Sequence, residues 1–309
     1  MSTPRIVVSV PSVELAADVQ PLPAGVELIV WPMDSAPPRD HIDLIVTPYL
    51  HQPGALSRLN DVSSRLVQSQ SIGYEGIESR LPVGTIFANA ASVHETSTAE
   101  LALALTLAAQ RELGRFVVSA TRGEWQTAFT ESLADKRVLL LGFGGVGKAV
   151  AARLAGFEAQ IVPVASRARE EDGFHVHGVD ELNALLPTSD VVILTLPGGE
   201  STHHIIGDAE LSLLPENALI VNVGRGPLVD TDALVAHVSR GRIRAALDVT
   251  DPEPLPQNHP LWALPGVLIS PHVGGATTAM RPRIARLVRR QIELMCAGSA
   301  PINVVVGGG

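Results

Sequence analysis

The chain has 309 residues, 46% of them hydrophobic and 18% charged, and a formal net charge of -9. Its length is sufficient for two domains, each with a packed core, and its composition is that of an ordinary soluble globular protein. The acidic balance gives no general electrostatic attraction to nucleic acid or anionic lipid, so neither is expected as a partner.

Three features of the sequence bear on localisation and membrane attachment. Cys296 is the only cysteine, so there is no intrachain disulfide and no cysteine-rich zinc site, which fits a reducing cytoplasm. The apolar run 6–10 ends at Pro11 and is too short for the core of a signal peptide. The strongly apolar segment 101–109 is far below the roughly 20 residues that span a bilayer. We therefore expect a cytoplasmic protein without a membrane span.

The first hundred residues alternate short apolar runs with polar, helix-like stretches. Buried strands are predicted at 5–10, 27–31, 43–49, 65–70 and 85–90, with helices between them at 12–19, 54–62 and 74–81. Such alternation predicts a parallel sheet that is covered on both faces.

A long apolar helix is predicted next, over 98–113. Ser97 and Glu100 have the spacing of a capping box, which places the start of the helix. Its residues are apolar nearly all the way round, and helices of that kind are buried on every side. Two interpretations fit: a helix packed against a second subunit, or a helix in the core of a monomer.

The alternation begins again at residue 136. Strands are predicted at 138–141, 159–165, 190–196, 218–224, 243–249 and 266–272, with helices at 147–156, 231–241 and 277–298. This second block has the pattern of a complete doubly wound unit, inserted between the two parts of the first block.

One glycine-rich turn permits two interpretations. Gly142, Gly144 and Gly147 follow a strand and precede a helix, in the G-x-G-x-x-G spacing of a dinucleotide-binding turn. In that pattern the glycines permit the tight turn, the approach of the pyrophosphate to the helix N-terminus and the close packing of the helix. The same letters nearly form a P-loop around Lys148, but Ala149 has no hydroxyl to hold Mg²⁺. The dinucleotide interpretation is therefore favoured over an ATPase.

Charged residues gather at the predicted carboxyl ends of three later strands, where doubly wound proteins bind ligands. They are Arg225, the carboxylates Asp248 and Glu253, and His272. The planar fork of an arginine suits a substrate carboxylate. A histidine beside a carboxylate favours its imidazolium form and can act as a general acid. Taken singly, each of these residues could also be structural, as an ion-pair partner, a loop carboxylate or a core histidine.

In this order and spacing the motifs resemble the D-2-hydroxyacid dehydrogenase family, which is D-isomer-specific and NAD(P)-dependent. The resemblance covers nearly the whole chain and is strongest over 136–277, through DVVILTLP, VNVGRGPLVDTDAL, ALDVTDPEPLP and SPHVGGAT. It implies an α/β protein with two doubly wound parallel-sheet domains. A Rossmann nucleotide-binding domain (99–275) would be inserted in a flavodoxin-like substrate-binding domain (1–98 and 276–309). It also implies that Arg225, Glu253 and His272 form the catalytic triad.

The resemblance further implies the contacts to the cofactor. They are expected from the glycine turn, from the loop after the strand 190–196 and from the loops that carry the triad: Gly142, Gly144, Gly145, Val146, Gly147, Leu196, Pro197, Thr202, Val223, Gly224, Asp248 and Gly274. Asp248 would contact the nicotinamide carboxamide. The segment 196–202 departs from the family, in which a bulkier pair more often follows Pro197.

The expected substrate is a small 2-keto or 2-hydroxy acid. The carboxylate-binding loop of the family corresponds to 71–76, where the N–H groups of Ile72 and Gly73 would hold the substrate carboxylate. Tyr49 and Leu50 are candidates for the pocket wall, and their apolar character favours a small or hydrophobic acid over a dicarboxylate. A homodimer is expected from the apolar helix 98–113 and from the habit of the family.

Two further interpretations concern regulation and metal binding. An NAD(P)-sensing regulator is an alternative function, because corepressors of the C-terminal-binding-protein type share this scaffold, although their tails and partner grooves have no obvious counterpart here. The histidine pairs His175–His177 and His203–His204 lack obvious carboxylate or thiol partners, so surface histidines are expected and no metal site is predicted.

The segment VASRAR at 164–169 ends the second predicted strand of the nucleotide-binding domain. NAD-preferring domains have a carboxylate at that strand end, which binds the ribose hydroxyls and repels a 2′-phosphate. Ser166 takes this place, and Arg167 and Arg169 follow it. These three side chains can bind a phosphate, so a preference for NADP(H) is expected. If the arginines only solvate a loop, the chain would use NAD(H) or both cofactors.

Overall fold

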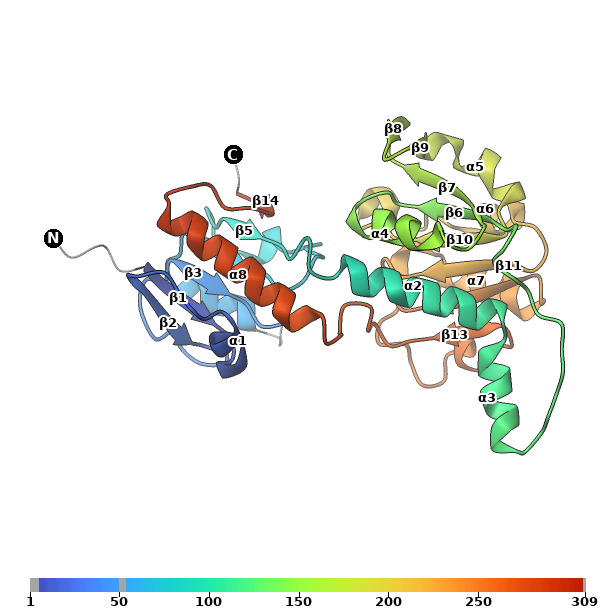
Figure 1. Ribbon diagram of the computed structural model, residues 1–309, viewed down its shortest axis with the longest axis horizontal. Coiled ribbons are helices and arrows are strands. Elements are labelled where there is room, and N and C mark those ends of the chain that lie inside the picture. Colours follow the sequence, from blue (N-terminus) through green and yellow to red (C-terminus); the bar gives the residue numbers. More distant parts are fainter. Residues whose placement is uncertain (1–5, 50–53, 308–309) are drawn as a thin grey trace. The chain divides into compact units, whose positions relative to one another are not determined.

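The computed structural model describes residues 6–49 and 54–307, and these residues form two compact units (Figure 1). The described residues before Glu95 and after Ala276 make up unit 1, and Glu95–Ala276 make up unit 2. The expected borders were at 98/99 and 275/276, whereas the contacts place them at 94/95 and 276/277. No helix in the described part of the chain is long and apolar enough to cross a membrane.

The sheet of unit 1 has the strand order of a flavodoxin-like fold. In the described residues its order is β14-β5-β4-β3-β1-β2, and only β14 is antiparallel to its neighbour. The strands are β1 (Ile6–Val10), β2 (Val26–Val30), β3 (Leu44–Val46), β4 (Leu66–Gln68), β5 (Phe87–Ala88) and β14 (Val304–Val306). All five strands expected in the first hundred residues are present, and β14 was not expected.

The helices of unit 1 differ more from the sequence prediction than its strands do. Among its described residues the α-helices are α1 (Val13–Asp18), capped by the Ser12 hydroxyl, and α8 (Met280–Cys296), which packs on α1. The predicted helices 54–62 and 74–81 are short 3-10 helices instead, Ala55–Asp61 and Glu78–Arg80. In the second of these segments Gly76 has a φ of +67°, which is incompatible with a continuous right-handed helix.

The sheet of unit 2 has the strand order of a Rossmann fold. Within the described residues its order is β13-β12-β11-β10-β6-β7-β9-β8, which reverses between β6 and β10. The strands are β6 (Arg137–Leu141), β7 (Gln160–Ala165), β8 (Arg169–Glu171), β9 (Phe174–Gly178), β10 (Val191–Leu194), β11 (Ala218–Asn222), β12 (Ile243–Leu247) and β13 (Val267–Ile269). The point of reversal is where such sheets bind ligands, outside the carboxyl ends of the strands.

The edge hairpin β8–β9 was not predicted. Asp172 and Gly173 connect its two strands, with φ values of +52° and +80°. A two-residue loop with positive φ at both positions is the preferred connection of an antiparallel hairpin, and Asp-Gly is a sequence signal for it.

The apolar helix lies mostly in the core of its own unit. It is α2 (Glu95–Gln110), and it packs on α4 (Gly145–Leu154), β11 and β12. Because α2 begins at Glu95, Ser97 lies within the helix and is buried, so the predicted capping box at Ser97 and Glu100 is wrong.

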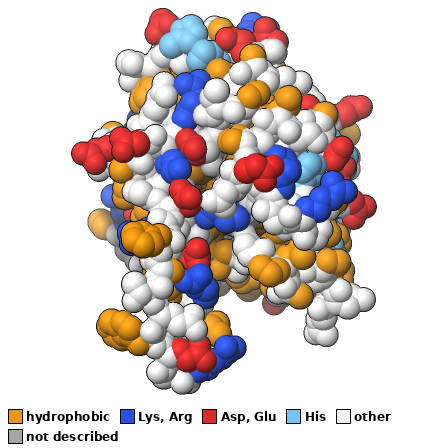
Figure 2. All heavy atoms as spheres, turned by 90° about the vertical axis from the view of Figure 1, so that its right-hand side faces the viewer, with side chains coloured by type: hydrophobic (Ala, Val, Ile, Leu, Met, Phe, Trp, Pro, Cys, Tyr) orange, Lys and Arg blue, Asp and Glu red, His pale blue; other side chains and the backbone are white. Residues whose placement is uncertain are grey.

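The segment after α2 projects from unit 2 and carries exposed apolar side chains. The chain turns at Glu112 into α3 (Leu113–Thr121), which projects downward at the right of Figure 1. In Figure 2 hydrophobic side chains lie along the lobe that reaches lowest. Those exposed on α3 and the segment that follows are Leu113, Val117, Val118, Trp125 and Phe129.

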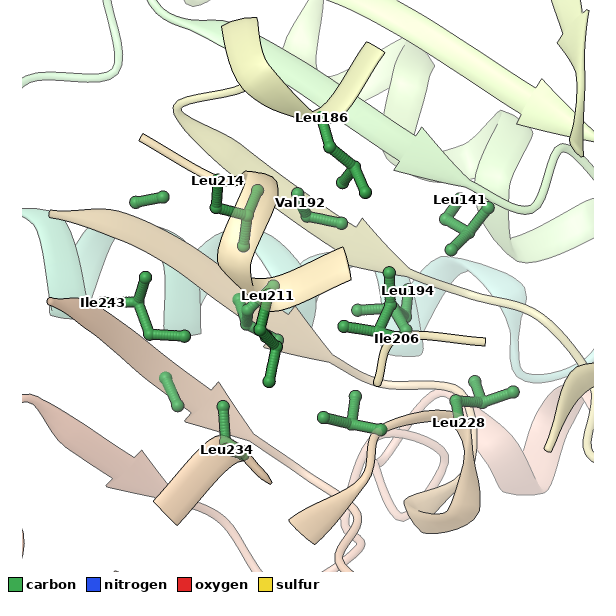
Figure 3. Packing of buried hydrophobic residues seen from close by; sticks show 14 of the residues in the cluster. Leu141, Leu186, Val192, Leu194, Ile206, Leu211, Leu214, Leu228, Leu234 and Ile243 are labelled. Atoms are coloured by element: carbon green, nitrogen blue, oxygen red, sulfur yellow. The ribbon is translucent and has the colours of Figure 1, made fainter. Parts of the chain in front are cut away.

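Apolar clusters cover both faces of the unit 2 sheet. On one face α2 and α4 pack on the strands. On the other face leucines such as Leu186, Leu211 and Leu234 pack against Leu194 and Ile243 of the sheet (Figure 3). The helices of this second face are α5 (Leu182–Leu185), α6 (Asp208–Leu213) and α7 (Thr231–Ser239). Strands buried on both faces explain the near-continuous Val, Ile and Leu runs of the sequence.

Candidate active site

The glycine turn lies at the point where the strand order of unit 2 reverses. Gly142 follows β6 with a φ of +109°, and a Cβ there would lie 2.7 Å from the Thr195 hydroxyl oxygen. Thr195, after β10, donates that hydroxyl to the Gly142 carbonyl at 2.9 Å. A Cβ on Gly147 would lie 2.0 Å from the same carbonyl, so glycine is required for α4 to pack on the turn.

The N-terminus of α4 fits a dinucleotide. Gly144 precedes the helix in an extended conformation, and a Cβ there would meet nothing within 4 Å. The backbone is therefore open on this side, where the first N–H groups of a helix can bind a pyrophosphate. Gly145 and Val146 begin the helix, and they are the residues that would hold the phosphates with these N–H groups.

Lys148 does not have the position of a P-loop lysine. Its ammonium lies 2.6 Å from a Glu171 carboxylate oxygen and 3.0 Å from one of Asp172, on the β8–β9 hairpin. The hydrogen bonds to these carboxylates raise the pKa of Lys148. Since the ammonium is bound by two carboxylates, the structure gives the ATPase interpretation no support.

The three residues proposed to discriminate the cofactor differ in their surroundings. Ser166 and Arg167 follow β7, are exposed, and their side chains make no hydrogen bond or ion pair with the described residues. Arg169 is the second residue after Arg167 and lies in β8, where its guanidinium binds Glu171 at 2.6 and 2.7 Å. Glu171 therefore binds both Arg169 and Lys148, so of the two arginines only Arg167 has a guanidinium without a partner among the described side chains.

The loop after β10 is closed by its own hydrogen bonds. Thr202 donates its hydroxyl to the Pro197 carbonyl at 2.9 Å. Leu196 lies beside two of the expected cofactor residues: a Cβ on Gly142 would lie 3.0 Å from its nitrogen, and one on Gly224 would lie 2.7 Å from its carbonyl oxygen. The loops after β6, β10 and β11 thus meet within unit 2.

Asn222 orients the loop that carries Arg225. It is buried at the end of β11, accepts the Gly224 N–H at 3.1 Å and donates to the Arg225 carbonyl at 2.8 Å. Val223, between Asn222 and Gly224, is buried. The Arg225 guanidinium donates to the Gly224 carbonyl at 2.7 Å. Asn222 was not singled out in the sequence, although an amide that ends an apolar strand is a recognisable signal of such a loop.

Asp248 holds the loop that carries His272. Its carboxylate is buried at the end of β12 and accepts the Ser270 hydroxyl at 2.6 Å and the Val273 and Gly274 N–H groups at 2.9 Å each. Its carbonyl accepts the His272 N–H at 2.7 Å. These contacts give Asp248 a positioning role for His272, and a contact to a nicotinamide carboxamide would use the remaining acceptor capacity of its carboxylate.

His272 and Glu253 form a close pair. The Nδ1 atom of His272 lies 2.5 Å from a Glu253 carboxylate oxygen, and both side chains are about half exposed. With Nδ1 bonded to a carboxylate, the other ring nitrogen is left to exchange a proton with a ligand. The pair therefore has the arrangement of a general acid–base histidine and the carboxylate that orients it.

Opposite electrostatic effects set the proton affinity of this pair. The hydrogen bond that His272 donates to Glu253 raises the pKa of His272, as do the charges of Glu253 and Asp248, whereas burial and the charge of Arg225 lower it. Burial tends to raise the pKa of Glu253, but the hydrogen bond and charge of His272 and the charge of Arg225 outweigh it, and the pKa falls. Arg225 is thus close enough for its charge to act on both partners.

Tyr49, Ile72 and Gly73, which are predicted to bind the substrate, belong to unit 1. Tyr49 stacks on His94 at a ring-centroid distance of 5.6 Å and lines a cavity of about 350 Å³ with apolar residues of α1 and α8. Ile72 is held by a hydrogen bond from Asn89 to its carbonyl, at 2.8 Å. No described residue accepts the N–H groups of Ile72 and Gly73. Leu50 lies outside the described residues.

Comparison with known proteins gives consistent results. A family model described as D-isomer specific 2-hydroxyacid dehydrogenase, NAD binding domain, matches residues 103–274. A glyoxylate reductase of Thermococcus litoralis is 31% identical over 300 residues, which cover 90% of each chain. A solved D-isomer specific 2-hydroxyacid dehydrogenase of Xanthobacter autotrophicus, in complex with NADPH, has a TM-score of 0.80, 25% identity and 99% coverage of both chains. An NADPH-dependent glyoxylate/hydroxypyruvate reductase of Sinorhizobium meliloti, in complex with NADP, has a TM-score of 0.78, 26% identity and coverage of 99% of this chain and 98% of its own.

Substitution of Glu253→Gln is expected to lower the pKa of His272. The hydrogen bond to the carboxylate is the largest of the effects that raise this pKa, and an amide carries no charge to stabilise the imidazolium. An NMR titration of the His272 ring proton measures the change. Asp251→Asn, two residues away in the same loop, is the matched control. An unchanged or higher pKa in Glu253→Gln would show that the pair does not act as described.

Proposed function

Because the chain belongs to the D-isomer specific 2-hydroxyacid dehydrogenase family and is an NAD(P)-dependent oxidoreductase, we propose that it reduces a 2-keto acid to a D-2-hydroxy acid, or catalyses the reverse reaction. The observation that carries the proposal is the His272–Glu253 pair under the charge of Arg225, in the unit that also carries the glycine turn. The reductase relatives support a 2-keto acid as the substrate class.

In the reduction, the carbonyl carbon gains a hydride and the carbonyl oxygen gains a proton. The hydride is the chemistry that a bound nicotinamide cofactor supplies. His272 donates the proton from the ring nitrogen that does not face Glu253, and Glu253 stabilises the imidazolium before the transfer. Arg225 binds the substrate carboxylate with its planar fork and polarises the carbonyl. In the oxidation, neutral His272 accepts the proton of the 2-hydroxyl group.

The cofactor proposed is NADP(H), with NAD(H) as a poorer alternative. Ser166 and Arg167 support this preference, because both side chains are exposed without partners in the described residues and no carboxylate occupies 164–169. Two of the similar structures are complexes with NADPH or NADP. Arg169 contributes less than the sequence predicts, since its guanidinium would have to leave or share Glu171.

The substrate proposed is a small or apolar 2-keto acid. The relatives named above are reductases of glyoxylate, or of glyoxylate and hydroxypyruvate. In unit 1, Tyr49 lines a cavity whose apolar walls include Leu15 and Ile284. Because Glu14 and Arg281 also line this cavity, support for a small acid comes from the relatives rather than from the walls of the cavity.

We also propose that the chain is a homodimer, through the projecting segment rather than through α2 itself. The helix α2 packs on its own unit, whereas Val117 of α3 is 65% exposed and Trp125 and Phe129 are almost fully exposed. Apolar side chains gathered on one surface segment are typical of a protein–protein interface. A second copy of the chain is the partner that this surface fits, in keeping with the expected homodimer.

The proposed proton donor can be tested by substitution. His272→Ala is expected to lower kcat by about 10²- to 10⁴-fold, the typical contribution of a general acid, while the reduced cofactor still binds. The assay is a panel of glyoxylate, hydroxypyruvate, pyruvate and phenylpyruvate with reduced cofactor, together with calorimetric cofactor binding. His41→Ala, in unit 1, is the control. Turnover like that of the wild type in His272→Ala, or no turnover of any keto acid by the wild type, would contradict the proposal, and the latter would favour an NAD(P)-sensing regulator.

The proposed cofactor preference can be measured with both cofactors. The wild type should have a kcat/KM at least about tenfold higher with NADPH than with NADH, which corresponds to ~1.4 kcal/mol. Arg167→Ala should remove most of this preference, mainly through KM for NADPH, because it removes a charge-assisted phosphate contact. Arg169→Ala is the comparison and should change the ratio less. Equal kcat/KM values in the wild type, or a larger effect of Arg169→Ala, would reject this assignment.

The proposed homodimer can be tested by the mass of the protein in solution. Light scattering should give the wild type twice the mass of the chain. A Val117→Asp, Phe129→Asp double variant should have the mass of one chain, because charges placed in a buried apolar interface are costly. Val83→Asp, at a fully exposed valine of unit 1, is the matched control. A monomeric wild type, or a double variant that keeps the dimer mass, would contradict the proposed interface.

A further inference from the structure

A second polar cluster lies on the β8–β9 hairpin. His175 and His177 are two residues apart in β9, so their side chains lie on the same face of the strand. Their ring centroids are 4.7 Å apart, with the rings nearly perpendicular. In Figure 2 pale-blue histidines and red carboxylates lie together at the top, the level of β8 and β9 in Figure 1.

The structure corrects the expectation that these histidines lack carboxylate partners. Glu170, opposite His175 in the hairpin register, lies 2.6 Å from the His175 Nδ1 atom. Glu181, in the 3-10 helix Val179–Glu181 that follows β9, lies 2.9 Å from the His177 Nδ1 atom. The sequence spacing of four between His177 and Glu181 did not predict this contact, because the intervening turn out of β9 was not predicted.

A backbone hydrogen bond orients Glu181. Its second carboxylate oxygen accepts the Gly178 N–H at 3.0 Å, which orients the group toward β9. The hydrogen bonds from His177 and Gly178 lower the pKa of Glu181. An oriented carboxylate beside two imidazoles has the electrostatic character of a cation site rather than of an anion site.

The donor set has the composition and spacing that a transition metal requires. In the described residues, one ligand atom each of His175, His177 and Glu181 lies within 4.8 Å of the others. A tetrahedral ion with ligands at about 2.1 Å needs ligand separations of roughly 3.4 Å, so side-chain rotations of the half-exposed groups bring the atoms into place. Two histidines and one glutamate form a known zinc ligand set.

We propose that His175, His177 and Glu181 bind one divalent transition-metal ion, Zn²⁺ above the others. Glu170 accepts the second ring N–H of His175, an arrangement that orients a histidine ligand and raises its basicity. The three ligands lie within a seven-residue segment, so the ion connects β9 to the 3-10 helix that follows it. The site is separate from the triad and does not depend on the proposed reductase activity.

Titration calorimetry of the untagged full chain, freed of metal by a chelator, tests the proposal with ZnCl₂ as the titrant. The wild type is expected to bind one Zn²⁺ per chain in a saturable manner. His177→Ala and Glu181→Gln are each expected to weaken Zn²⁺ binding at least about tenfold. Loss of a ligand should cost no less than loss of a group that only orients one, which typically costs about 10–100-fold. His203→Ala in the other histidine pair, whose rings stack at 3.9 Å, is the matched control and should bind as the wild type does.

A second measurement separates loss of the site from loss of the fold. Cobalt(II) in a tetrahedral site with nitrogen and oxygen ligands gives visible absorption bands, which should be present in the wild type and absent in His177→Ala. Circular dichroism of both proteins checks that the fold is unchanged. Failure of the wild type to bind Zn²⁺, or equal binding by folded wild type and His177→Ala, would overturn the proposal.

Discussion

The position of His272 depends on one buried carboxylate, that of Asp248. The His272 backbone has a φ of +53°, which is unfavourable for a residue with a Cβ by about 1–3 kcal/mol unless the surroundings impose it. Three hydrogen bonds from the loop to the Asp248 carboxylate, and one from the His272 N–H to the Asp248 carbonyl, impose it. Asp248 is 3% exposed, and a carboxylate buried to this degree requires hydrogen-bond donors such as these. The strained backbone and the buried charge therefore stabilise each other.

Two opposing charges then act on the histidine that this loop presents. Glu253 raises the pKa of His272, whereas burial and, to a smaller extent, the charge of Arg225 limit the rise. A smaller rise leaves the imidazolium a stronger acid than it would be beside Glu253 alone, which suits proton donation to a weakly basic carbonyl oxygen. Arg225 thus has two effects under the proposed function: it binds the substrate carboxylate, and its charge adds to burial in lowering the pKa of the group that protonates the substrate.

Most strands of the fold could be predicted because their signals are local, whereas the catalytic roles of Arg225, Glu253 and His272 stay predictions that the family resemblance implies. The Val, Ile and Leu runs predicted the strands correctly from Ile6 to Ile269, with the edge hairpin as the exception, since buried parallel strands are apolar on both faces. Asp248 follows β12 directly, and Arg225 and His272 are the third residues after β11 and β13, so the sheet places all three at the carboxyl ends of neighbouring strands. The capping box at Ser97 failed because a polar helix start is short and is overridden by the packing of α2. The role of Asp248 depends on hydrogen bonds to residues 22 to 26 positions away, which no local pattern shows.

Because the turn between β8 and β9 was not predicted, the contacts on both faces of this hairpin were not predicted either. Because side chains alternate along a strand, Glu170, His175 and His177 share one face, and Arg169, Glu171 and Val176 share the other. On the second face Val176 is buried, and Glu171 binds both Arg169 and Lys148, so these side chains fasten the hairpin to α4. If the segment is interpreted as a loop, both Arg167 and Arg169 are available to bind a phosphate, and His175 and His177 have no partners. In the hairpin Arg169 binds Glu171, so only Arg167 is available for the cofactor. The hairpin also places His175 and His177 beside Glu170 and Glu181, the carboxylates on which the proposed metal site depends.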